Sequence, residues 1–200
     1  MKKIRIAITG GIGSGKSTVC NIIKDLGFEV VSCDDVYTQL LDSKEFVLKI
    51  CEITCTEPIS SDKGHLFIDR AEISRKVFED SALKSRLERF THPVIMDECI
   101  SRLKDVNGPA FVEVPLLFEN GLEKFFDHVI VVMRPIKERV ASVFKRSGLT
   151  EEQVKQRINN QFDYENFTSN VHTVLYNGSS VEELKKNTGD ALEKIFKAFN

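Results

Sequence analysis

The chain has 200 residues, a formal net charge of −2 at pH 7 and 42% hydrophobic residues. This length suits one domain, or one core with small insertions. The charge balance argues against a nucleic-acid or membrane-surface binder, and no run approaches the roughly 18 apolar residues of a membrane span. Five cysteines without framework spacing, and an N-terminus without an apolar signal segment, predict a cytoplasmic protein with reduced thiols.

The first element is a short apolar run at residues 4–8, which predicts a buried strand. Residues 10–17 then match G-x-x-x-x-G-K-[ST], and apolar residues recur at helical spacing until Gly27. Such a loop between strand and helix forms an anion-binding concavity of backbone N–H groups. We expect Lys16 to reach the β- and γ-phosphates of a nucleoside triphosphate and the Ser17 hydroxyl to bind Mg²⁺. The alternative is a glycine-rich turn that binds nothing. The expected nucleotide-binding residues are Gly11, Gly13, Ser14, Gly15, Lys16, Ser17 and Thr18.

Residues 29–33 form a second apolar run, and Asp34 follows it directly. In open parallel sheets, ligands bind beyond the carboxyl ends of the strands. The position therefore predicts that Asp34 is delivered to the edge of the phosphate-binding loop and acts as a catalytic acid or base. Its alternative role is the N-cap of the helix that follows.

Residues 35–105 contain helical patterns and no clear strand, with an exposed loop at 56–63. Asp69 can cap a helix that buries Ile73, Val77 and Phe78. Arg70 then lies in the first helical turn, where a cation is unfavourable, so it either meets an anionic ligand or is simply solvated.

Pro93 fits the first position of a new helix. His92 precedes this proline and is therefore expected in an extended conformation. Taken by itself, a histidine at this position is more often packed and hydrogen-bonded than bound to a ligand.

Residues 110–114 predict a third strand and 128–133 a fourth, both apolar and buried. Glu113 lies at the end of the third strand, where an acid commonly holds Mg²⁺ beside a phosphate loop. Glu119, in the following turn, could serve an acceptor substrate instead. Either residue could also be a surface carboxylate.

Two helices joined at residues 147–149 carry Arg139 and Arg146, which are seven positions apart and so lie on nearly the same helical face. The pair predicts a mobile lid that offsets charge on a transferring phosphoryl group, or else a solvated surface helix. Residues 173–176 predict a fifth strand. Asn177 follows it and either lines an adenine pocket or forms a plain turn.

Several separated stretches together resemble the dephospho-CoA kinase family. The resemblance covers nearly the whole chain and includes the loop at 9–18, Asp34, and the stretches 68–70, 92–93, 115–119, 157–161 and 177–178. The chain departs from the family pattern at Ser32, where an aspartate is usual, and at Ser142, where an arginine is frequent.

The resemblance implies that ATP phosphorylates the ribose 3′-hydroxyl of dephospho-CoA, with Mg²⁺, to give CoA and ADP. It implies that Asp34 accepts or orients the proton of this hydroxyl, while Lys16, Arg139 and Arg146 stabilise the transferring phosphoryl group. The residues that it implies for dephospho-CoA binding are Asp34, Arg70, His92, Leu117, Phe118 and Glu119. Only these small-molecule partners are expected, and the sequence does not determine the oligomeric state.

We therefore expect an α/β P-loop kinase fold, a three-layer sandwich with a five-stranded parallel sheet. Its nucleotide-binding core comprises 1–34, 106–135 and 170–200, its helical dephospho-CoA-binding region 35–105, and its helical lid 136–169. A kinase of another small metabolite, such as a nucleoside, nucleotide or sugar, is one alternative. A non-catalytic nucleotide-binding regulatory module is another.

Overall fold

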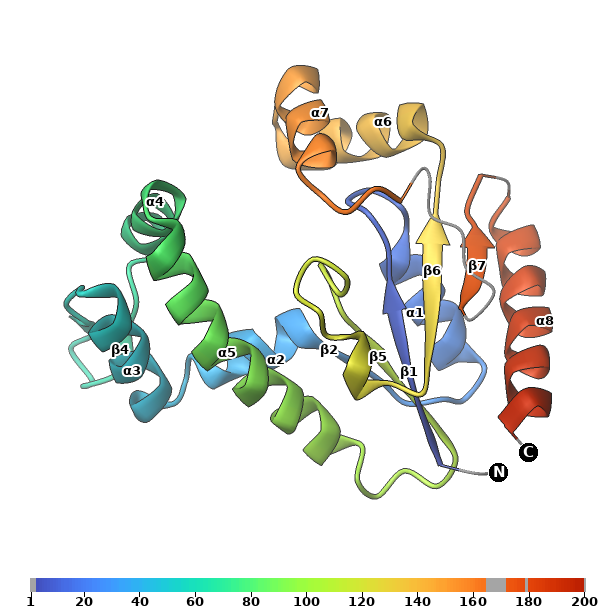
Figure 1. The fold of residues 1–200 in the computed structure, drawn as a ribbon, viewed down its shortest axis with the longest axis horizontal. Coiled ribbons are helices and arrows are strands. Elements are labelled where there is room, and N and C mark those ends of the chain that lie inside the picture. The colour runs from blue at the N-terminus through green and yellow to red at the C-terminus, as the bar shows by residue number, and fades with distance from the viewer. Residues whose placement is uncertain (1–2, 165–171, 179, 200) are drawn as a thin grey trace. The chain divides into compact units, whose positions relative to one another are not determined.

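The computed structural model describes residues 3–164, 172–178 and 180–199 (Figure 1). The chain divides into two compact units, which we call the core unit (Met1–Ser32 with Leu103–Asn200) and the helical unit (Cys33–Arg102). The end of the expected lid, 165–169, lies outside the described residues, as do positions 1–2, 170–171, 179 and 200 of the expected nucleotide-binding core. The functional division into core, acceptor region and lid stays a prediction.

The core unit is built on a parallel sheet, as predicted. Its strands run in the order β2-β5-β1-β6-β7, and every neighbouring pair is parallel. β1 and β6 are almost entirely buried, which explains why their sequences are continuous apolar runs. The strands are β1 (Ile4–Thr9), β2 (Val30–Ser32), β5 (Pro109–Glu113), β6 (His128–Met133) and β7 (Thr173–Tyr176).

The helices of the core unit fall into two groups. α1 (Lys16–Asp25) and α8 (Val181–Phe199) pack apolar side chains onto the strands in one shared hydrophobic cluster. α6 (Ile136–Ser147) and α7 (Glu151–Asn159) form a pair with its own small core, and a short 3₁₀ turn, η1 (Glu123–Phe125), precedes β6. Thr150 and Gln153 form the capping box that begins α7.

The helical unit contains α2 (Cys33–Leu40), α3 (Lys44–Thr54), α4 (Arg70–Glu79) and α5 (Ser81–Arg102). α5 packs against each of the other three helices. Ser43 caps α3, and Asp69 caps α4 by accepting two backbone N–H groups at 2.9 Å. No helix among the described residues is long and apolar enough to cross a membrane.

The structure corrects three expectations for the helical unit. Pro93 does not start a helix but lies inside the 22-residue α5, so His92 is helical rather than extended. A proline inside a helix costs about 3 kcal/mol, and the contacts of α5 with three helices offset that cost. Residues 59–60, inside the loop expected at 56–63, pair with residues 66–67 in a small antiparallel hairpin, β3–β4. Phe78 is 92% exposed rather than buried.

Candidate active site

The glycine-rich loop connects β1 to α1 at the carboxyl edge of the sheet (Figure 1). Gly13 and Gly15 have φ values of 77° and 92°, a region that favours glycine. A Cβ at Gly13 would lie 2.7 Å from the carbonyl oxygen of Arg139, so the loop is also closely packed there. Gly15 gives α1 no side-chain cap, and the first turn of α1 has no acid. The backbone N–H groups at the start of α1 are therefore suited to an anionic ligand.

Lys16 lies over the loop that precedes it. Its Nζ donates to the carbonyl oxygens of Gly10 at 2.7 Å and Gly11 at 3.3 Å. The ammonium group is thus held beside the same concavity that the loop N–H groups form.

Ser17, in the first turn of α1, and Glu113, the last residue of β5, bring a hydroxyl and a carboxylate together. Ser17 Oγ lies 3.4 Å from Glu113 Oε1. Glu113 is opposite Ile8 in the parallel register of β1 and β5, which fixes it at the loop edge. Oxygen donors of this kind are the ligands that Mg²⁺ prefers, so the pair fits that ion. Burial, and then the charge of Glu113, raise the pKa of the neighbouring Cys20 thiol.

Ile12, in the loop, is held by two side chains from distant parts of the chain. Arg139 Nε donates to the Ile12 carbonyl at 3.0 Å, and Gln161 Oε1 accepts from the Ile12 N–H at 2.7 Å. The Ile12 side chain also packs on the cluster formed by α6 and α7. Gln161 lies in the stretch 157–161 that carries the family resemblance, but the sequence assigned it no role because its contact with Ile12 forms only in the fold.

Asn177 fixes the next part of the loop. Its Nδ2 donates to the Ser14 carbonyl at 2.9 Å, and its N–H donates to the carbonyl of Met133 at 2.8 Å. The Asn177 side chain therefore supports the loop itself. The contact with adenine, one of the two roles considered from the sequence, stays a prediction.

The two lid arginines differ in their environments. Arg139 is only 3% exposed and lies against the loop, whereas Arg146, the last residue but one of α6, is exposed. The seven-residue spacing suggested that they share a face. In the structure Arg139 lies against the loop while Arg146 is exposed, so the shared spacing does not give the two side chains the same surroundings.

The turn after β5 carries one fully buried side chain and two that contact the segment after α7. Leu117 is fully buried, so its side chain offers no surface to a ligand here. The Phe118 ring lies 4.9 Å from that of Phe162, and Glu119 Oε1 accepts the Phe162 N–H at 2.8 Å. Glu119 therefore holds the segment that follows α7.

Three expected acceptor-site residues lie in the helical unit. Asp34 is exposed in the first turn of α2, which begins at Cys33, so it is not the N-cap. A carboxylate there interacts favourably with the helix dipole. Arg70 is exposed at the start of α4. His92 is half-buried in α5, and burial lowers its pKa more than the charge of Glu88 raises it.

Comparison with known proteins gives consistent matches. A family model described as dephospho-CoA kinase matches residues 4–183. A dephospho-CoA kinase of Corynebacterium glutamicum is 32% identical over 197 residues, covering 96% of this chain and all of that protein. One from Thermus thermophilus is 35% identical, over 92% of this chain and 87% of its own. A solved dephospho-CoA kinase from Campylobacter jejuni superposes with a TM-score of 0.69 at 27% identity, over the full length of both chains.

Proposed function

The chain belongs to the dephospho-CoA kinase family, and we propose that Asp34, Lys16 and Ser17 are central to its reaction. That reaction transfers the γ-phosphoryl group of ATP to dephospho-CoA. The ribose 3′-oxygen forms a bond to the γ-phosphorus, the bond from that phosphorus to the β–γ bridging oxygen breaks, and ADP leaves. The 3′-hydroxyl proton passes to the Asp34 carboxylate.

The glycine-rich loop and Lys16 bind the triphosphate. Loop N–H groups receive the phosphate oxygens, and Lys16 Nζ exchanges its carbonyl acceptors for the β- and γ-phosphates. Support comes from the open N-terminus of α1, which has neither a side-chain cap nor an acid in its first turn. Positioning and electrostatic stabilisation then supply most of the rate acceleration.

Ser17 and Glu113 are the residues that we assign to Mg²⁺. Their 3.4 Å approach supports this assignment, since a hydroxyl and a carboxylate oxygen suit a hard cation. Bound there, the ion supplies positive charge that neutralises the phosphate oxygens.

Arg139 and Arg146 divide the lid function. Arg139 shapes the loop through the Ile12 carbonyl, and the exposed Arg146 neutralises charge on the transferring phosphoryl group. We assign Arg70, His92 and Phe118 to contacts with dephospho-CoA, while the buried Leu117 and the bonded Glu119 hold the turn that carries Phe118. Asn177 contributes to nucleotide binding by holding Ser14.

We also propose a cytoplasmic location, supported by five free thiols, since such thiols persist in a reducing compartment. The net charge of −2 supports small-molecule substrates rather than nucleic acid.

One experiment tests the assignment of Asp34. We expect Asp34→Asn to lower the kcat for CoA formation by on the order of 10²-fold and to leave the KM for ATP within about twofold of the wild-type value. CoA is measured by mass spectrometry. Asp35→Asn is the matched control, because Asp35 is also exposed in the first turn of α2. Wild-type kcat in Asp34→Asn would exclude Asp34 as the base.

A further inference from the structure

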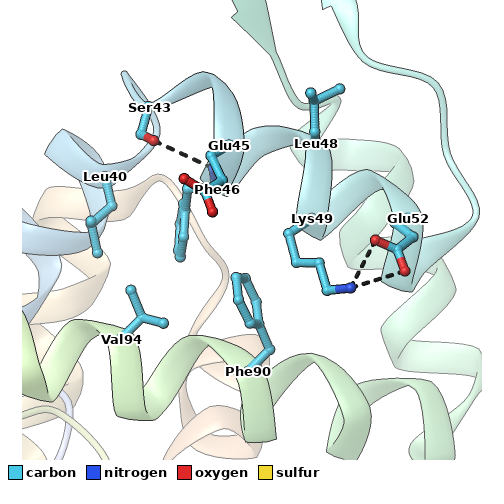
Figure 2. A pocket seen from close by; sticks show the side chains of 9 residues that line it. All are labelled: Leu40, Ser43, Glu45, Phe46, Leu48, Lys49, Glu52, Phe90 and Val94. Carbon is cyan, nitrogen blue, oxygen red and sulfur yellow. Dashed lines mark hydrogen bonds and ion pairs between the residues drawn. The ribbon is translucent and has the colours of Figure 1, made fainter.

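The helical unit contains a cavity of about 670 Å³ beneath α3, where α2 and α5 also contribute walls. Figure 2 shows Leu40, Phe46, Phe90 and Val94 pointing toward one another to form an apolar floor. The Phe46 and Phe90 rings lie 5.5 Å apart. A cavity of this size, with aromatic walls, is typical of a small-molecule site.

The rim of the cavity is polar and carries more negative than positive charge. Its charged groups are Glu45, Lys49 and Glu52, and Lys49 Nζ is bonded to Glu52 at 2.8 and 2.9 Å. Two carboxylates around one paired ammonium disfavour an anionic ligand. Carboxylate oxygens and the Ser43 hydroxyl can accept hydrogen bonds from amides and hydroxyls. The lining therefore suits an uncharged chain that combines apolar and amide groups.

α2 connects this cavity to Asp34. Leu40 follows Asp34 by six residues, which is about 9 Å along a helix. Tyr37 lies midway and packs edge-on against Phe46 at 6.1 Å. Burial raises the pKa of Tyr37, and the charge of Arg70 opposes that rise. The Arg70 cation is therefore near enough to act on Tyr37, between Asp34 and Leu40.

We propose that this cavity binds the pantetheine arm of dephospho-CoA, an inference that rests on the function proposed above. The arm is uncharged and carries two methyl groups, a hydroxyl and two amides. It starts nine covalent bonds from the 3′-oxygen, roughly 10 Å at about 1.5 Å per bond along a zigzag chain. This matches the separation of Asp34 and Leu40. The intervening diphosphate then lies near Arg70.

Filling the cavity tests the proposal. We expect Val94→Phe to raise the KM for dephospho-CoA about 10-fold or more, with the KM for ATP within about twofold, because only acceptor contacts are lost. Val77→Phe is the matched control. Val77 is also a partly buried valine on a helix of the same unit, but it lies outside the cavity lining. Equal increases in both variants would reflect general disruption and overturn the proposal.

Pantetheine alone provides a second measurement. It should inhibit the wild-type enzyme competitively against dephospho-CoA, and its inhibition constant should rise about 10-fold in Val94→Phe. Phe90→Leu, a milder change in the same wall, should weaken pantetheine in the same direction if Val94→Phe fails to fold. Absent or unchanged inhibition would overturn the cavity assignment alone. A wild-type protein that forms no CoA would instead overturn the proposed function.

Discussion

Arg139 and Ile12 are joined by a hydrogen bond of 3.0 Å from the guanidinium Nε to the backbone carbonyl, although 127 positions separate them. Arg139 is 3% exposed, and a Cβ at Gly11 would overlap its guanidinium group. The positive charge of Arg139 is therefore buried directly against the phosphate-binding loop. This side chain, together with the packing of Ile12 on the cluster of α6 and α7, couples the shape of the loop to the position of α6.

Arg139→Ala should weaken ATP binding and destabilise the protein. The change leaves the part-buried Ile12 carbonyl without this donor and opens a cavity, so we expect the KM for ATP to rise about 10-fold and the Tm to fall by about 5 °C. Steady-state kinetics and thermal unfolding measure both. Lys137→Ala, an exposed change on the same helix, should alter neither. An unchanged KM for ATP would mean that the loop keeps its shape without Arg139.

Arg146→Ala should affect the chemical step and not stability. Arg146 is exposed, so removing it opens no cavity, but it removes a charge from the transferring phosphoryl group. We expect kcat to fall by about 10- to 100-fold with the Tm within about 1 °C. Lys145→Ala is the control, since Lys145 is an exposed cation beside it. If kcat and both KM values equal those of the wild type, Arg146 has no part in transfer.

The sequence predicted the strands and the loop well, because each has a local signal. β6 and β7 have the predicted bounds, since apolar runs end at polar or turn residues. The contacts of Ile12 could not be predicted, because Arg139 and Gln161 meet it only through the tertiary fold. The prediction that Pro93 starts a helix was wrong for the same reason. The packing of α5 outweighs the local preference of proline for a helix start.

Glu113→Gln should raise the Mg²⁺ concentration that the enzyme needs. The amide keeps the size of the side chain but lacks the negative charge, so we expect the half-saturating Mg²⁺ to rise about 10-fold at fixed ATP. Glu119→Gln tests the other carboxylate that the sequence left open. Because Glu119 is bonded to the Phe162 N–H, this change should leave the Mg²⁺ requirement unaltered. The opposite pattern would assign the metal to Glu119.

His128 should make the stability of the core unit depend on pH. Its Nε2 lies 2.8 Å from Thr173 Oγ1, linking β6 to β7, and burial and then the charge of His172 lower its pKa. As pH falls below the ordinary histidine pKa of about 6.5, the unfolded chain therefore binds a proton that the folded chain resists. The free energy of unfolding, measured in urea by circular dichroism, should thus be greater at about pH 7.5 than at about pH 5.5. His128→Gln can retain the bond to Thr173 without titrating, so it should lose less stability over this interval, whereas exposed His65→Gln should behave like the wild type. An equal loss in His128→Gln and wild type would mean that His128 does not contribute to the pH dependence.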